Sequence, residues 1–122
     1  MAIMADQIRQ FDEDGYVILD RILTSERAER ARAALARIFR GEYIGDRRPP
    51  GFRKPLPTFP EDSSAPKHLV NGRLLDGDLW ELSTDRQIAQ MAAILLRTPS
   101  LSLLEDQLIG KAPRSGDRNE PA

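Results

Sequence analysis

Six of the nine prolines in this chain fall within one stretch, residues 41–67, and this concentration limits the possible folds more than any other feature. Proline has no backbone N–H, and its ring clashes with the preceding helical turn, so a regular helix is excluded and a central strand is disfavoured. We therefore predict a long loop over residues 41–67. Loops of this length are usually functional covers or disordered segments, and the sequence does not separate the two.

Residues 1–40, which precede this loop, are predicted to form a helix, a strand and a second helix. In "ADQIRQFDEDG" the apolar residues Ile8 and Phe11 share one helical face, and Gly15 is a natural helix end. The β-prone run "YVIL" follows directly and predicts a short strand at residues 16–19.

The second predicted helix is "SERAERARAALARIFRGEY", which Thr24 or Ser25 can cap. Its arginines fall mostly outside the apolar stripe, so we expect a helix that packs on the core and exposes a basic face. The stripe repeats at helical spacing and consists of Ala28, Ala31, Leu35 and Ile38.

Residues 68–122 are predicted to add a helix and a strand, which makes the fold class α+β. "LLDGDLWELS" indicates a turn and a short segment carrying Trp80 and Leu82. The next helix begins at a polar cap in "STD" and is ended by Pro99. One strand, or two short ones, is expected within "LSLLEDQLIGKAP", residues 101–113. The apolar stripe of the helix consists of Ile88, Met91, Ala92 and Leu95.

Charge and composition exclude several partners. With 18 basic and 19 acidic residues the net charge is -1, so no overall field attracts nucleic acid or an anionic membrane. The chain has no cysteine, and no apolar run approaches the ~20 residues of a membrane span. The N-terminus becomes acidic too early for a secretory signal. We therefore predict a cytoplasmic protein that binds neither nucleic acid nor membranes.

Few residues carry recognisable chemistry. His68 is the single histidine, so one chain does not supply a two-histidine metal site, and we interpret it as an ordinary loop or boundary residue. Residues 37–54 hold six basic and two acidic side chains, a local charge of +4, for which a solvated loop is favoured over phosphate binding. Within the final apolar run, Glu105 and Asp106 must face water, a cavity or a partner. The carboxylates of "FDEDG" are expected to be solvated turn residues.

Two stretches nevertheless resemble a known family. "IRQFDEDGYVILDRILTSERAERARAAL" resembles the N-terminal segment of the phytanoyl-CoA dioxygenase family, in which a helix ending in F-x-x-D-G-Y precedes a strand and an S-x-E helix. "DLWELSTDRQIAQMAAILLRTPSLSLLEDQLIGKAPRSG" is similar to the family's next segment, where a strand leads into a lysine, a proline and a polar turn. The resemblance spans nearly the whole chain except the proline-rich loop.

The resemblance implies a non-haem Fe(II), 2-oxoglutarate-dependent oxygenase that hydroxylates a small organic substrate. It implies a double-stranded β-helix (jelly-roll or cupin-like) fold, with iron held by two histidines and one carboxylate. Here residues 1–122 are expected to be a single partial domain, consisting of segments 1–40, 41–67 and 68–122, that stops before the metal-binding core. Iron binding and catalysis by this chain alone are therefore not expected.

One site residue is carried over from the family. Lys111 matches the lysine of its K-P-P turn, which contacts the 2-oxoglutarate carboxylate, although the turn here reads "KAP". Without the resemblance, Lys111 would be interpreted as a surface lysine at a strand end. Two alternatives stay open: a small non-catalytic α+β binding module, or one piece of a split oxygenase. If most of the barrel sheet is missing, exposed core surface should favour self-association.

Overall fold

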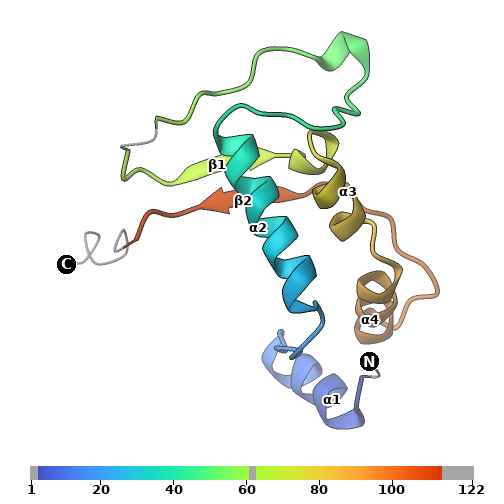
Figure 1. The fold of residues 1–122 in the computed structure, drawn as a ribbon. Coiled ribbons are helices and arrows are strands. Elements are labelled where there is room, and N and C mark those ends of the chain that lie inside the picture. The colour runs from blue at the N-terminus through green and yellow to red at the C-terminus, as the bar shows by residue number, and fades with distance from the viewer. Residues whose placement is uncertain (1–2, 61–62, 114–122) are drawn as a thin grey trace.

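The structure, a computed structural model, describes residues 3–60 and 63–113, in which helices and two strands follow one another along the chain (Figure 1). The elements are, in order, α1 (Ala5–Asp14), α2 (Ser25–Phe39), the 3₁₀ turn η1 (Pro50–Phe52), β1 (Lys67–Val70), the 3₁₀ turn η2 (Gly72–Leu74), α3 (Gly77–Ser83), α4 (Arg86–Leu96) and β2 (Gln107–Gly110).

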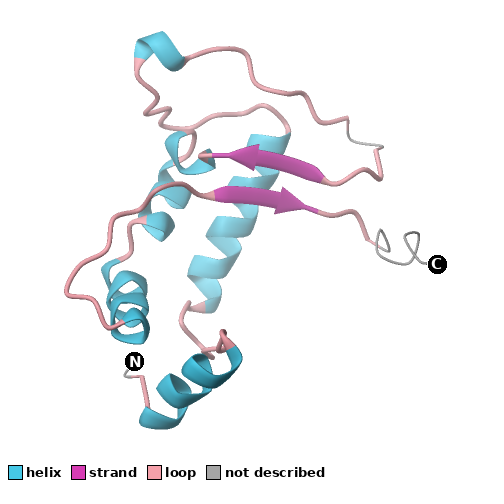
Figure 2. Cartoon of the chain, turned by 180° about the vertical axis from the view of Figure 1, so that it is seen from behind, coloured by secondary structure: helices cyan, strands magenta, loops and turns pink. Residues whose placement is uncertain are grey.

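The two strands form an antiparallel sheet that packs one face against α2. Leu69 of β1 lies opposite Leu108 of β2, and both side chains are buried on the α2 side. Figures 1 and 2 view this layer from opposite directions and show α2 crossing the pair of strands. Because side chains alternate along a strand, the neighbouring residues Val70 and Ile109 lie on the other face, where they are 43% and 59% exposed.

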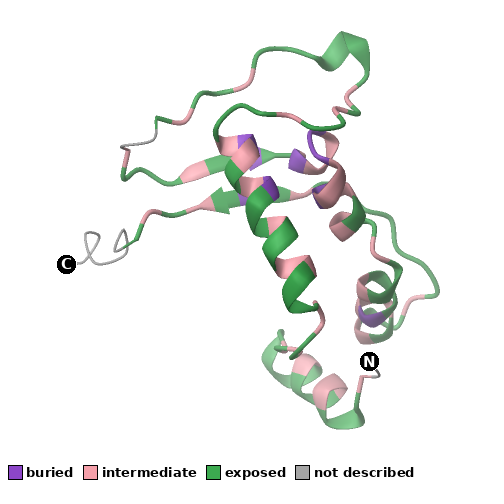
Figure 3. Ribbon diagram, viewed as in Figure 1, coloured by how far each residue is buried: buried purple, intermediate pink, exposed green. Residues whose placement is uncertain are grey.

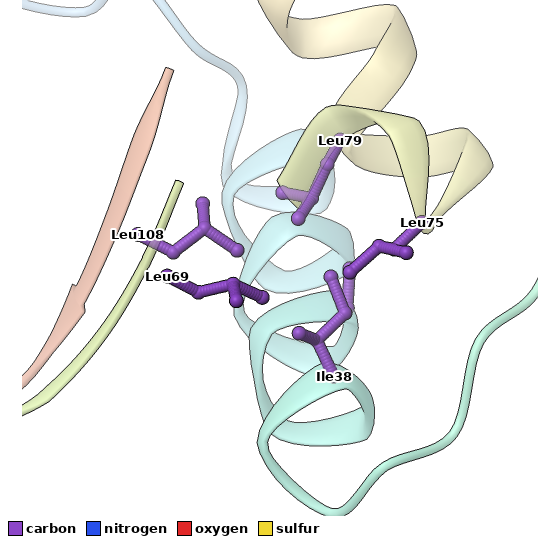
Figure 4. Packing of buried hydrophobic residues seen from close by; sticks show 6 residues of the cluster. Ile38, Leu69, Leu75, Leu79 and Leu108 are labelled. Atoms are coloured by element: carbon purple, nitrogen blue, oxygen red, sulfur yellow. The ribbon is translucent and has the colours of Figure 1, made fainter. Parts of the chain in front are cut away.

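The hydrophobic core lies where α2, the sheet and the η2–α3 segment meet. Ala34 and Ile38 of α2 contact the inner face of the sheet, and Leu75 and Leu79 close the core from the third side (Figure 4). Buried positions gather in this region, whereas α1 contributes none (Figure 3). The stripe predicted for α2 is therefore confirmed as the core-facing side of that helix, with Ala28, Ala31 and Leu35 half-buried and Ile38 buried.

Local capping explains where the longer helices begin and end. Thr24 accepts a hydrogen bond from the backbone N–H of Arg27 at 3.2 Å, and Asp85 accepts one from Ile88 at 3.0 Å. Gly15, with φ of 81°, adopts the left-handed conformation and donates its N–H to the Phe11 carbonyl at 2.9 Å. These caps confirm the predicted end of α1 and the predicted starts of α2 and α4, whereas α2 ends at Phe39, before the predicted end at Tyr43.

The proline-rich segment runs over the surface as predicted, but it is attached to the core. The Phe59 ring meets the Phe39 ring edge to face, with 5.2 Å between centroids. Nearer its start, the segment pairs with the beginning of α3, because Gly77 donates its N–H to the Ile44 carbonyl at 3.1 Å. The Arg47 N–H also donates to the carbonyl of Leu74. This segment is therefore a mostly exposed strap that is held to the core at Phe59 and at residues 44–47.

The strand predicted at residues 16–19 was wrong, and two other segments have a structure that their local pattern did not specify. Residues 16–19 form no strand and pair with no other segment in the described chain, and Ile18 is 76% exposed. The segment carrying Trp80 is a helix, α3. His68, which was interpreted as a loop or boundary residue, lies in β1, at the end of the predicted loop. A strand requires a neighbour for its backbone N–H and C=O groups, and that neighbour is not visible in a local pattern.

The final strand is shorter than predicted. Of residues 101–113 only Gln107–Gly110 form β2, and the preceding residues are irregular and mostly exposed. The described residues therefore form a small α+β unit with one two-stranded antiparallel sheet. The α+β class is confirmed at this level, and the double-stranded β-helix stays a prediction.

Replacing Gly72 is predicted to destabilise the fold, because this residue is buried against the side chain of Leu108. A methyl group at this position would overlap the Leu108 side chain, so Gly72→Ala should lower the free energy of unfolding by about 2 kcal/mol. Chemical denaturation followed by circular dichroism measures this change. Gly51→Ala is the control, since a methyl group there meets no atom within 4 Å; equal stabilities of the two variants would contradict the packing described.

Candidate functional site

Lys111 lies directly after β2, at an open groove of about 310 Å³. The groove is bounded by the end of α2, the start of β1 and the residues that follow β2, which bring Phe39, Lys67 and Lys111 together. Its described lining contains two ammonium groups and no carboxylate. The groove is therefore positively charged and partly apolar.

An aromatic ring forms part of this groove. The Lys67 Nζ lies 5.6 Å from the centroid of the Phe39 ring, a cation–π distance. Gly110 allows the ring to approach, because a Cβ at that position would lie 2.9 Å from Phe39 Cε2. Sequence reasoning missed Lys67 and Phe39, since neither belongs to a motif and only the strand register brings them beside Lys111.

His68 does not belong to the groove lining. It lies on β1 between inward-facing neighbours, is exposed, and its Nε2 is 3.3 Å from Gln107 Oε1 on the adjacent strand. The prediction that His68 is an ordinary residue is consistent with this cross-strand contact. In residues 3–60 and 63–113, no three His, Cys, Asp or Glu side chains are arranged to hold a metal ion.

The basic segment at residues 37–54 has internal partners for most of its arginines. Arg48 pairs with Asp46 at 2.8 Å, and Arg40 pairs with Glu42 at 3.2 Å. The Arg47 guanidinium stacks over the Trp80 ring at 4.5 Å. These contacts hold the arginines in place, but the local charge of +4 already counts Asp46 and Glu42, so it is reduced only where Arg37 pairs with Asp76 outside the segment.

Asp76 is the most buried charged residue described, with 1% of its surface exposed. Its Oδ2 accepts hydrogen bonds from Arg37 Nε at 3.1 Å and Nη2 at 2.9 Å, while Oδ1 accepts the backbone N–H of Asp78 at 2.9 Å. The bond to Asp76 raises the pKa of the Arg37 guanidinium above its ordinary value. A buried carboxylate whose two oxygens both accept hydrogen bonds from the protein is interpreted as a structural group.

The two acidic residues singled out before β2 have separate partners. Asp106 accepts a 2.7 Å hydrogen bond from Arg73 Nη1, whereas Glu105 is exposed and accepts one from Gln107 Nε2 at 3.1 Å. The expectation that an acid in this apolar run needs a partner or water is confirmed. In "FDEDG", Asp12 is bound by Arg97, whose hydrogen bond lowers the pKa of the Asp12 carboxyl. Neither Glu105 with Asp106 nor the carboxylates of "FDEDG" therefore form an acid/base site.

Comparisons of the chain with protein-family models, curated proteins and solved structures found no match. None of the helices within the described ranges combines the length and apolar content that a membrane crossing requires. The geometry of the Lys111 groove is therefore the main structural evidence on function.

Replacing Asp76 should lower the stability of the fold more than replacing its neighbour Asp78. Asp76→Ala leaves the Arg37 guanidinium without its buried partner and removes the cap of α3, so we expect a loss of about 3 kcal/mol in the free energy of unfolding. Urea denaturation measures the loss. Asp78→Ala is the matched control: Asp78 makes one 3.2 Å bond to Arg37 and is more exposed, so its loss should stay below about 1 kcal/mol. A reversed order would contradict the structural role of Asp76.

The Asp46–Arg48 pair should make stability depend on pH. Hydrogen bonds from the Arg48 side chain and backbone N–H lower the pKa of Asp46 to about 2, from 3.8 when unperturbed. Because the folded pKa is depressed, this stabilisation is complete above about pH 4 and is lost as pH falls to 2. The stability difference between the natural chain and Asp46→Asn should therefore shrink over that interval. Thermal melts at each pH measure it, and a constant difference would disprove the coupling.

Proposed function

We propose that this chain is the N-terminal part of an Fe(II)/2-oxoglutarate-dependent oxygenase of the phytanoyl-CoA dioxygenase family, which hydroxylates a small organic substrate. The observation that carries the proposal is the position of Lys111. The family resemblance assigns this lysine to the co-substrate carboxylate, and it lines a groove whose described lining contains basic but no acidic side chains. An ammonium group in such a setting is suited to a carboxylate ligand.

The sheet also supports this assignment. Its inner face is covered by α2, while its outer face carries Val70 and Ile109, both substantially exposed. Each strand also has one edge without a partner among the described residues. A two-stranded sheet of this kind is compatible with the beginning of a larger double-stranded β-helix, and the same exposed surface would allow self-association of the isolated chain.

The described residues do not fit an iron site. The metal centre implied by the resemblance requires two histidines and a carboxylate, and the sequence has one histidine, His68, which contacts Gln107 on the adjacent strand. We therefore derive no catalytic step through iron. The proposed contribution of these residues is to bind and orient the carboxylate of 2-oxoglutarate, with catalysis depending on ligands from a further segment or a partner chain.

A second candidate, a small non-catalytic binding module, is favoured by the self-contained core. The cluster formed by Ala34, Ile38, Leu69, Leu75, Leu79 and Leu108 is contributed entirely by this chain. The buried side-chain polar atoms among the described residues all have hydrogen-bond partners. Such a chain would be a stable monomer with one cooperative unfolding transition, and the groove would then serve as a simple anion-binding site.

The coding DNA tests the proposal directly. Reading past codon 122 in all three frames should reveal a His-x-Asp sequence soon after the Lys111 turn and a second histidine much later. The intact mass of the natural protein should then exceed that of 122 residues.

A natural mass equal to 122 residues, together with unrelated downstream sequence, would overturn the single-chain proposal. A split oxygenase would then require a co-purifying chain that carries both histidines. A monodisperse, cooperatively unfolding monomer with no such partner would favour the binding module.

A further inference from the structure

We propose that Lys67 is the second cation of the Lys111 groove and that the two lysines together bind a short-chain dicarboxylate. The resemblance that led to Lys111 does not point to Lys67. The inference rests on the proposed function only for the role of Lys111, and it assigns Lys67 from the geometry of the sheet.

The strand register brings the two lysines to the same end of the sheet. Lys67 pairs with Gly110 across the antiparallel ladder, so Lys111 is the residue that follows its cross-strand partner. Both residues line the same groove. Lys67 also lies on the inner face of β1, because it is two residues from the buried Leu69 and its Nζ lies over Phe39. Its ammonium group is therefore held at the groove by an aromatic contact.

Some basic side chains of the described residues are neutralised by carboxylates, and others are not. Arg27 pairs with Asp85 at 2.7 Å and Arg73 with Asp106 at 2.7 Å, whereas Arg47 contacts the Trp80 ring and, among the described residues, no carboxylate. Within the described residues, neither Lys67 nor Lys111 forms an ion pair with an acidic side chain. Two unneutralised cations in one groove create a positive potential that an anion of charge -2 would satisfy.

The shape and lining of the groove indicate the class of anion. Phe39 provides an apolar surface at the end of α2, and its ring packs against Gly110, where a Cβ would lie 2.9 Å from Phe39 Cε2. A compact anion such as phosphate has no part that would contact a ring. A dicarboxylate has two charged ends joined by methylene or carbonyl carbons, which suit two ammonium groups and an apolar wall. The volume of about 310 Å³ lies at the lower end for small-molecule sites.

Calorimetric titration of the full chain, in low-salt buffer without phosphate, tests this inference. The probes are 2-oxoglutarate, glutarate, the monocarboxylate pyruvate and inorganic phosphate. We expect both dicarboxylates to bind about tenfold more tightly than pyruvate, since the second carboxylate adds a charge-assisted contact. Lys67→Gln should remove this preference, and Lys67→Arg should retain most of it. Lys54→Gln is the matched control, because Lys54 is an exposed lysine that does not line the groove.

The outcomes separate this inference from the proposed function. If Lys111→Gln abolishes dicarboxylate binding but Lys67→Gln leaves it unchanged, the inference is overturned and the assignment of Lys111 survives. If Lys67→Gln is the only variant with an effect, the two-lysine site and the role of Lys111 both fall. Equal affinity for pyruvate, tighter binding of phosphate, or no binding by the natural chain each overturns the inference. Circular dichroism melts exclude unfolding of a variant as the cause.

Discussion

The arrangement of the other elements depends on the hydrogen bonds that the buried carboxylate of Asp76 accepts. A charge with 1% exposure is tolerated only when all of its oxygens are satisfied, and the partners come from separate parts of the chain. Arg37 reaches it from α2, the backbone N–H of Asp78 reaches it from α3, and the adjacent Gly77 is hydrogen-bonded to the strap at Ile44. Forming this one site therefore fixes α2, α3 and the beginning of the proline-rich segment relative to one another.

The parts of the fold that were predicted from the sequence are those specified locally. Gly15, Thr24 and Asp85 act on backbone groups within four residues of themselves, and the stripes of α2 and α4 follow from a single helical period. The parts that were missed depend on remote partners. The short helix α3 requires Arg37 from α2 to satisfy its cap residue, β1 requires β2, and the apolar run at residues 16–19 has no strand to join among the described residues.

The same distinction applies to the candidate site. Lys111 was found because it falls in a short motif that resembles a family turn, whereas Lys67 was read as the end of a loop. Only the pairing of Lys67 with Gly110 shows that the two lysines share a groove, and such a register is not encoded in either four-residue strand. A local signal for Asp76 did exist, since "DGD" before an apolar helical segment is a capping pattern, but its burial follows from the tertiary packing.

The pairing of β1 with β2 also has a consequence for the order of folding. The strands lie on either side of η2, α3 and α4, so joining them closes a long segment of chain and carries a corresponding entropic cost. Local helices form faster than such non-local pairs, so we expect the sheet to close late on the folding pathway. The groove between Lys67 and Lys111 then exists only after this last step. A ligand held there would slow the unfolding of the chain while leaving its folding rate almost unchanged.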